Sequence, residues 1–238
     1  MAGPCVLSVN IVHALIADPV GSVGRTAIDK RPVDGAAEIA RLGVVGDTCL
    51  DRKNHGGVDQ AVYAYAREDQ QFWQGELGRA VDPGWFGENL TTAGLDVTGA
   101  VIGERWQVDT VDGSGPVLLE VTAPRIPCST FQAFTGEAHW VKRFTDHGAP
   151  GAYLRVLGEG VIAAGATITV VHRPQHGVSI GEVFVLRLAD PARLQLLLDT
   201  GQDLHEPLAA AIRSQLARSG PGRQPSQAAD SILTGSQT

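Results

Sequence analysis

A single cysteine closes a stiff loop in the second half of the chain. Cys128 follows Pro124-Arg125-Ile126-Pro127, and each proline fixes its own φ and restricts the residue before it. The cation of Arg125 favours the thiolate, which is the form of cysteine that ligates soft metals and attacks electrophiles. A lone cysteine is more often an inert core residue. Cys128 is therefore a candidate metal ligand or nucleophile whose role depends on its surroundings.

The other two cysteines, Cys5 and Cys49, occupy unrelated positions, and the sequence holds no C-x-x-C pair. This spacing argues against a structural zinc site and against a redox disulfide. We therefore expect any cysteine chemistry to depend on one thiol.

A polar segment, residues 46–63, places several charges and a histidine in front of an expected strand. It contains His55-Gly56-Gly57 and, two residues later, Asp59. Paired glycines permit backbone conformations in which N–H groups converge on an anion, although no G-K-[ST] sequence follows to make a P-loop. The alternative interpretation is a polar turn closed by its own Asp and Asn side chains.

A third segment, residues 84–90, joins an aromatic pair to Glu88 and Asn89 directly before another expected strand. On its own, this segment is typical of a glycine-flanked turn with a core aromatic residue.

The elements that must position these residues are mostly short strands. Apolar and β-branched runs bounded by Gly, Pro or Asp predict strands over residues 5–16, 26–33, 61–65, 88–91, 105–111, 117–121, 152–157 and 167–172. Helical spacing is found at 68–77 and 137–144. We expect a mainly β (α+β) domain over residues 1–174, built as a closed or strongly curled, barrel-like sheet with a few peripheral helices.

After Pro174 the pattern becomes helical. Ser179 to Glu182 is a capping-box arrangement, Asp190-Pro191 is an N-cap followed by proline, and apolar residues recur every fourth position between Glu206 and Arg218. Residues 175–218 are thus predicted to form a three-helix C-terminal appendage. Residues 219–238, rich in Ser, Gly, Gln and Pro, are predicted to be a disordered tail.

The composition excludes some classes of partner. A net charge of −7 gives the chain no general attraction for nucleic acid or anionic lipid. Its apolar runs are shorter than the roughly 18 residues of a membrane span, and no basic start with an apolar core resembles a signal peptide. We expect a cytoplasmic protein without nucleic-acid or membrane partners, in which any phosphate site is a local basic pocket.

Taken together and in this order, the motifs resemble the MOSC family, named for the C-terminal domain of molybdenum-cofactor sulfurases, and most closely its YiiM-type bacterial members. The resemblance rests on residues 26–33, Gly46-Asp47, Asp51-Arg52, residues 55–65, residues 86–90 and Pro124-Arg125-Ile126-Pro127-Cys128. It implies a β-barrel-like fold that binds the molybdenum–molybdopterin cofactor, with Cys128 as the one protein thiolate on the metal. The further cofactor contacts that it implies are Thr26, Lys30, Arg31, Arg52, Gly56, Gly57, Asn89 and Arg125.

The resemblance also implies a reaction. YiiM-type and amidoxime-reducing members reduce N-hydroxylated or N-oxygenated compounds such as hydroxylamino-purines and amidoximes, a detoxifying activity. His55 and Asp59 are candidates to supply protons, with a structural role as the other interpretation of His55. The chain has no G-x-G-x-x-G fingerprint and no iron–sulfur cysteine set, so a separate flavin-type reductase is the expected electron donor. Pyridoxal phosphate is not expected, and a homodimer is compatible with the sequence.

Three other functions use the same residues. A sulfur or cofactor carrier would hold a persulfide on Cys128 or pass the molybdenum cofactor on. A Cys–His hydrolase would pair Cys128 with His55 or His139, but no partner spacing supports it. A binding module without chemistry is the third alternative, and the rigid loop before Cys128 argues against it.

Overall fold

The structure is a computed structural model that describes residues 3–52, 55–200 and 203–219. Its strands are β1 (Cys5–Ala17), β2 (Arg25–Pro32), β3 (Ala36–Ala40), β4 (Gly43–Val44), β5 (Val62–Ala66), β6 (Leu90–Ala93), β7 (Arg105–Val108), β8 (Val117–Pro124), β9 (Ala152–Gly158), β10 (Gly160–Ala163) and β11 (Ile168–His172). Its α-helices are α1 (Arg67–Leu77), α2 (Ser129–Thr135), α3 (Trp140–His147), α4 (Ile180–Phe184), α5 (Pro191–Asp199) and α6 (Glu206–Ser219), with 3-10 turns η1 (Val58–Gln60) and η2 (Leu186–Leu188).

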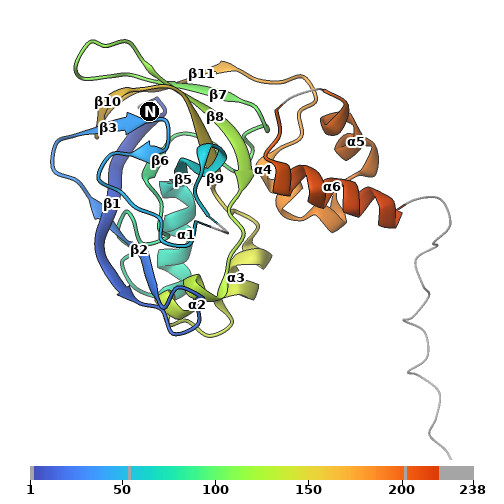
Figure 1. Ribbon diagram of the computed structural model, residues 1–238, viewed down its shortest axis with the longest axis horizontal. Coiled ribbons are helices and arrows are strands. Elements are labelled where there is room, and N and C mark those ends of the chain that lie inside the picture. The colour runs from blue at the N-terminus through green and yellow to red at the C-terminus, as the bar shows by residue number, and fades with distance from the viewer. Residues whose placement is uncertain (1–2, 53–54, 201–202, 220–238) are drawn as a thin grey trace, which may run out of the picture.

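Within the described residues, eight strands form one curled sheet in the order β11-β7-β8-β9-β5-β6-β1-β2, and β10, β3 and β4 form a smaller one (Figure 1). The ends of the large sheet meet where Cys5 bridges Thr167. The contact is limited to the start of β1, because β2 pairs with the later residues of the same edge of β1. The mainly β class and the strong curl are confirmed, but no continuous ladder closes the described strands into a barrel.

Two clusters of buried side chains make up the core. An aliphatic cluster runs from the strands into the C-terminal helices and includes Val121, Ile180, Leu194 and Ile212. An aromatic cluster joins strand β5 to α1, α2 and α3 and consists of Tyr63, Tyr65, Trp73, Phe86, Phe131, Trp140 and Phe144, together with Ile28 and Val81. The partly buried Cys128 packs against the aromatic cluster, so a stacked aromatic layer supports the end of the proline loop.

The predicted elements are largely present, with shifted ends. The structure adds β3, β4, β10 and α2, which the sequence analysis did not predict, and α3 begins at Trp140 rather than at Glu137. Helix α2 ends at Thr135 and is capped by Gly136, whose φ is 68°, and His139 before α3 has a φ of 55°. The left-handed His139 lies inside the helix expected from Glu137 to Phe144, so the observed helix begins only at Trp140.

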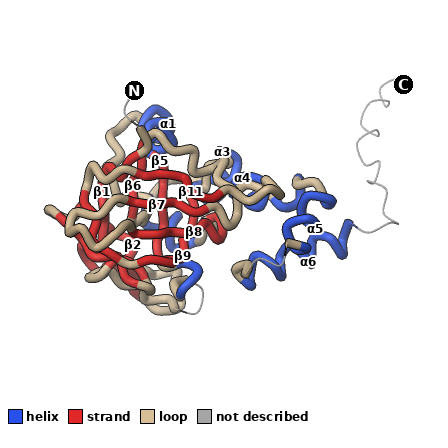
Figure 2. Tube along the Cα trace, turned by 90° about the horizontal axis from the view of Figure 1, so that it is seen from above, coloured by secondary structure: helices blue, strands red, loops and turns tan. Residues whose placement is uncertain are grey.

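Helices α4, α5 and α6 stand together beside the sheet in both views (Figures 1 and 2). The capping box at Ser179 and the N-cap at Asp190 are formed as predicted. Helix α4 packs against β8. The predicted tail, residues 219–238, lies outside the described residues from 220 onward. No helix in the described ranges has the length and apolar character to cross a membrane.

Candidate functional site

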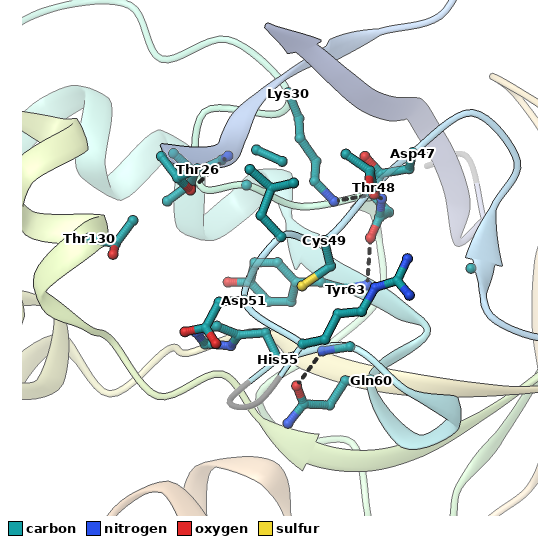
Figure 3. Close-up of a pocket in the computed structure, with 18 of the residues that line it drawn as sticks. Thr26, Lys30, Asp47, Thr48, Cys49, Asp51, His55, Gln60, Tyr63 and Thr130 are labelled. Atoms are coloured by element: carbon teal, nitrogen blue, oxygen red, sulfur yellow. Dashed lines mark hydrogen bonds and ion pairs between the residues drawn. The ribbon is translucent and has the colours of Figure 1, made fainter. Parts of the chain in front are cut away.

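A cavity of about 510 Å³ opens between β2, the segments 42–52 and 55–61, and the residues that follow β8 (Figure 3). Segments far apart in the sequence therefore meet at one place. The predicted site residues that line this cavity are Thr26, Lys30, Arg52, His55, Gly56, Gly57, Asn89, Arg125 and Cys128.

Cys128 is the N-cap residue of α2, and its side chain faces the cavity. Burial raises the pKa of its thiol, but three other effects together outweigh burial and lower this pKa. They are a hydrogen bond from His55, the charge of Arg125 and the nearby backbone N–H of Phe131. The resulting pKa is about 7, against an ordinary value of 9.0. A large fraction of this thiol is therefore thiolate at neutral pH, which is the form that ligates metals.

Arg125 carries a buried positive charge beside that thiol. The residue is 6% exposed, and its guanidinium carbon lies 4.0 Å from the centre of the Phe131 ring and 5.8 Å from that of Tyr63. Its one hydrogen bond in the described structure is a long one, 3.5 Å, to the carbonyl of Ile126. No carboxylate of the described residues pairs with it. A buried cation of this kind favours an anion in the cavity.

A second cation that lines the cavity, Lys30 of β2, is held by a polar network. Its ammonium pairs with Asp47, and Asp47 also accepts hydrogen bonds from Asn89 Nδ2 at 2.7 Å and from the backbone N–H of Val12 at 2.9 Å. Asn89 in turn accepts from the backbone N–H of Tyr63 at 3.1 Å. The network joins β1, β2, β5 and the start of β6, so Lys30 and Asn89 are fixed in place.

The glycine pair forms a tight turn at the cavity wall. Gly56 and Gly57 have φ values of 81° and 82°, a region that glycine enters without steric strain. The N–H of Gly56 donates to Gln60 Oε1 at 3.1 Å. The preceding residue, His55, hydrogen-bonds to the thiol of Cys128. The turn therefore places an imidazole on the thiol across 73 residues of sequence.

Two predicted residues lie away from the cavity. Arg31 is exposed on the other face of β2 from Lys30 because successive strand side chains alternate, and it pairs with Asp29 at 3.3 Å. Asp59 faces the opposite side of η1, where its carboxylate binds Arg155 at 2.6 Å. The fold thus does not bring Arg31 or Asp59 together with the thiol.

Several residues that the sequence analysis left out do line the cavity. They are Asp18, Arg25, Asp47, Cys49, Tyr63, Tyr153 and Thr130, among others. Asp47 and Tyr63 stood within recognised motifs, whereas Asp18 had no local signal. The Asp18 carboxylate accepts a hydrogen bond from the hydroxyl of Thr130 at 2.6 Å, and this contact ties the β1–β2 turn to the helix that Cys128 begins.

The cavity combines a reactive thiolate, a buried guanidinium and an imidazole with further cations at its mouth, where Arg25 and Arg52 are exposed. Such a set of groups can bind an anionic ligand, hold a soft metal by one sulfur and move protons beside it.

Comparisons with known proteins agree with the sequence resemblance. The family model described as "MOSC domain" matches residues 51–169. The protein YflK of Bacillus subtilis (strain 168) is 34% identical over 175 residues, which cover 74% of this chain and 76% of YflK. A protein named "Reductase" from Gibberella moniliformis is 31% identical over 199 residues, covering 82% of this chain but 34% of that longer protein.

The crystal structure of YiiM from Geobacillus stearothermophilus superposes with a TM-score of 0.70 at 26% identity, covering 90% of this chain and 99% of that one. Sequence and fold thus give the same assignment, and this chain belongs to the MOSC domain family.

Proposed function

We propose that the protein binds a molybdenum–molybdopterin cofactor through Cys128 and reduces N-hydroxylated or N-oxygenated compounds. When bound, such a cofactor supplies the two-electron reduction of an N–O bond. The residues of this chain would hold the cofactor, admit the substrate and deliver protons.

The observation that carries the proposal is the pairing of Cys128 with Arg125. A thiol whose pKa is about 7 suits a soft metal that brings further sulfur ligands with its own pterin. The neighbouring guanidinium is 6% exposed and lacks a carboxylate partner in the described structure, so an anionic group would satisfy it. The residues present therefore fit this cofactor.

The remaining cavity residues have distinct proposed tasks. Arg52 and Arg25, exposed at the mouth, would bind the phosphate of the pterin by charge-assisted hydrogen bonds. The backbone of Gly56 and Gly57 would approach the ligand closely, since neither residue has a side chain. The imidazole of His55, already hydrogen-bonded at the sulfur, would pass protons to the substrate oxygen.

The electrons would come from a separate flavin-type reductase. The fungal relative named "Reductase" shares 31% identity with this chain over a part that makes up 34% of the fungal protein, which supports a redox role for the shared part. A substrate small enough for a cavity of about 510 Å³, which the cofactor would share, is a further expectation.

Elemental analysis tests this function directly. Freshly purified protein should contain molybdenum in near-stoichiometric amount and reduce a hydroxylamino-purine or an amidoxime when supplied with a flavin reductase. Cys128→Ser should lose both the metal and the activity while unfolding at nearly the same temperature, because an oxygen ligand suits a soft metal poorly. Cys49→Ser is the matched control and should keep both.

A different pattern would favour the carrier function. Metal-free protein that bears a persulfide on Cys128, with no turnover of N-oxygenated compounds, would indicate sulfur transfer instead of reduction.

A further inference from the structure

A histidine directly before the last helix contacts a residue of the cavity wall. His205 lies directly before α6, and its Nε2 is 3.3 Å from Nε2 of Gln60. Gln60 lines the cavity, and its amide oxygen accepts the N–H of Gly56 (Figure 3). A chain of hydrogen bonds thus leads from the helical appendage to the turn that carries His55.

The direction of these bonds follows from their donors. The backbone N–H of Gly56 can only donate, so it fixes the Gln60 amide with the oxygen toward Gly56 and the NH₂ group toward His205. His205 Nε2 must then accept, which requires a neutral imidazole. Burial lowers the pKa of His205, an effect that Asp59 opposes and Arg155 adds to. The neutral ring that this geometry needs is therefore favoured.

Ionic contacts hold the same two segments together. Arg155 of β9 binds Asp59 at 2.6 Å and the carboxylate of Asp203 at 3.1 Å, and it donates to the carbonyl of Asp203. The hydroxyl of Thr122 donates to the carbonyl of Asp59 at 2.5 Å. Residues 58–60 are thereby fixed on β8 and β9, and the segment 203–205 is fixed against them.

Within the described residues, the turn also has two backbone hydrogen bonds, from the N–H of His55 to the carbonyl of Asp51 at 2.9 Å and from the N–H of Gln60 to the carbonyl of Gly57 at 3.3 Å. Gly56 and Gly57 both have positive φ and no side chain, and the acceptor that the structure gives to the Gly56 N–H is the side chain of Gln60. A Gln60 amide that is free to rotate would release this bond. The position of His55 on the thiol then depends in part on a contact made by a different part of the fold.

We propose that His205 is a positioning residue, which fixes the Gln60 amide and through it the Gly56–Gly57 turn that presents His55 to Cys128. A role of His205 in catalysis rests on the function proposed above, whereas its contact with Gln60 does not. The C-terminal helices thus complete the cavity without lining it.

Hydrogen exchange measured by mass spectrometry tests the proposal in the full-length protein. His205→Phe keeps a ring but cannot accept a hydrogen bond, so exchange in a peptide covering residues 55–60 should become about fivefold to tenfold faster, which corresponds to one lost hydrogen bond. His205→Gln restores an acceptor and should return exchange and molybdenum content toward the wild-type values. Arg213→Ala, an exposed change on α6, is the control.

Peptides from β8 serve as the internal reference for global unfolding. Faster exchange confined to residues 55–60 in His205→Phe, with a lower molybdenum content, supports the proposal. Unchanged exchange there, or an equal rise in the β8 peptides, overturns it. Wild-type protein without molybdenum would contradict the proposed function instead, and the exchange result would still decide the role of His205.

Discussion

Cys128 and Cys49 line the same cavity, yet their surroundings move the pKa values of the two thiols in opposite directions. Cys128 receives a hydrogen bond from His55 and lies near Arg125. Burial raises the pKa of Cys49, and the lowering effect of Lys30 is opposed by Asp51 and Asp47. Selective reactivity of one thiol is therefore a property of its neighbours, because the side chains themselves are identical.

This difference predicts the pH dependence of alkylation. In protein expressed without molybdate, iodoacetamide should modify Cys128 with a midpoint near pH 7, while Cys49 reacts slowly until alkaline pH. Because the pKa of folded Cys128 lies below the ordinary 9.0, its stabilising contribution is complete above pH 9 and is lost as the pH falls through about 7. His55→Ala should shift the midpoint of Cys128 alkylation to higher pH. Peptide mass mapping reads out each cysteine, and coincident profiles would contradict the assignment.

The arginines of the cavity give a second residue-scale prediction. In a chain of net charge −7, an anionic cofactor must be held by a few short-range contacts. Arg125→Ala and Arg52→Ala should each lower retained molybdenum and pterin by roughly tenfold or more, since a charge-assisted hydrogen bond contributes about 1.5–3 kcal/mol.

Exposed Arg213→Ala is the control for these variants and should retain the cofactor. Should Arg125→Ala and Arg52→Ala both match it, the two arginines would not be cofactor ligands.

At the scale of the elements, the position of β2 depends on a glycine outside it. Gly84 has a φ of 89°, and a Cβ atom there would lie 2.4 Å from the carbonyl oxygen of Lys30. Gly24, in the β1–β2 turn, has a φ of 74° but open space around its Cβ position. Of these two glycines, Gly84 alone therefore combines a left-handed conformation with a close approach of two backbones.

Alanine substitutions separate these two effects. Gly24→Ala should cost about 1–2 kcal/mol of unfolding free energy from the left-handed backbone alone. Gly84→Ala should cost about 3 kcal/mol or more, because it also pushes on the backbone of Lys30. Urea unfolding measures both variants. Equal losses would mean that β2 can move aside without cost.

At the scale of the whole molecule, the aliphatic core continues from the sheet into the C-terminal helices. Val178 and Ile180 belong to the same buried cluster as the strands. Their backbones also hydrogen-bond to the sheet domain, from the N–H of Ile102 to Val178 and from the N–H of Ile180 to Ala100. The proposed boundary at residue 174 therefore separates two parts that share one core.

Two truncations test this arrangement. A chain ending at Pro174 should bind a hydrophobic dye and aggregate, because it leaves apolar side chains uncovered and the backbone groups of Ala100 and Ile102 without partners. A chain ending at Ser219 should behave as the full-length protein, since residues 220–238 offer little apolar surface to bury. Soluble, cooperatively unfolding protein from the first truncation would contradict a shared core.

Much of this architecture could be predicted from local sequence. Runs of apolar and β-branched residues bounded by Gly, Pro or Asp predicted β1, β2 and β9, and the capping residues Ser179 and Asp190 predicted the starts of α4 and α5. These signals are local because a strand or a helix start depends on neighbours within a few residues. The short strands β3 and β10, of five and four residues, carried too little pattern to predict and exist through pairing with each other.

The site in the cavity likewise has a part that the sequence could indicate and a part that it could not. Cys128 and Arg125 could be singled out from their proline loop alone. Only the tertiary structure decided that His55 lies on that thiol, that Arg31 faces away from the cavity, that Asp59 binds Arg155, and that His205 reaches Gln60. The partners in these contacts are distant in sequence, and strand alternation and side-chain packing determine which of them meet. Sequence by itself therefore indicates which residues have reactive chemistry, and the packing of the fold selects those that act together.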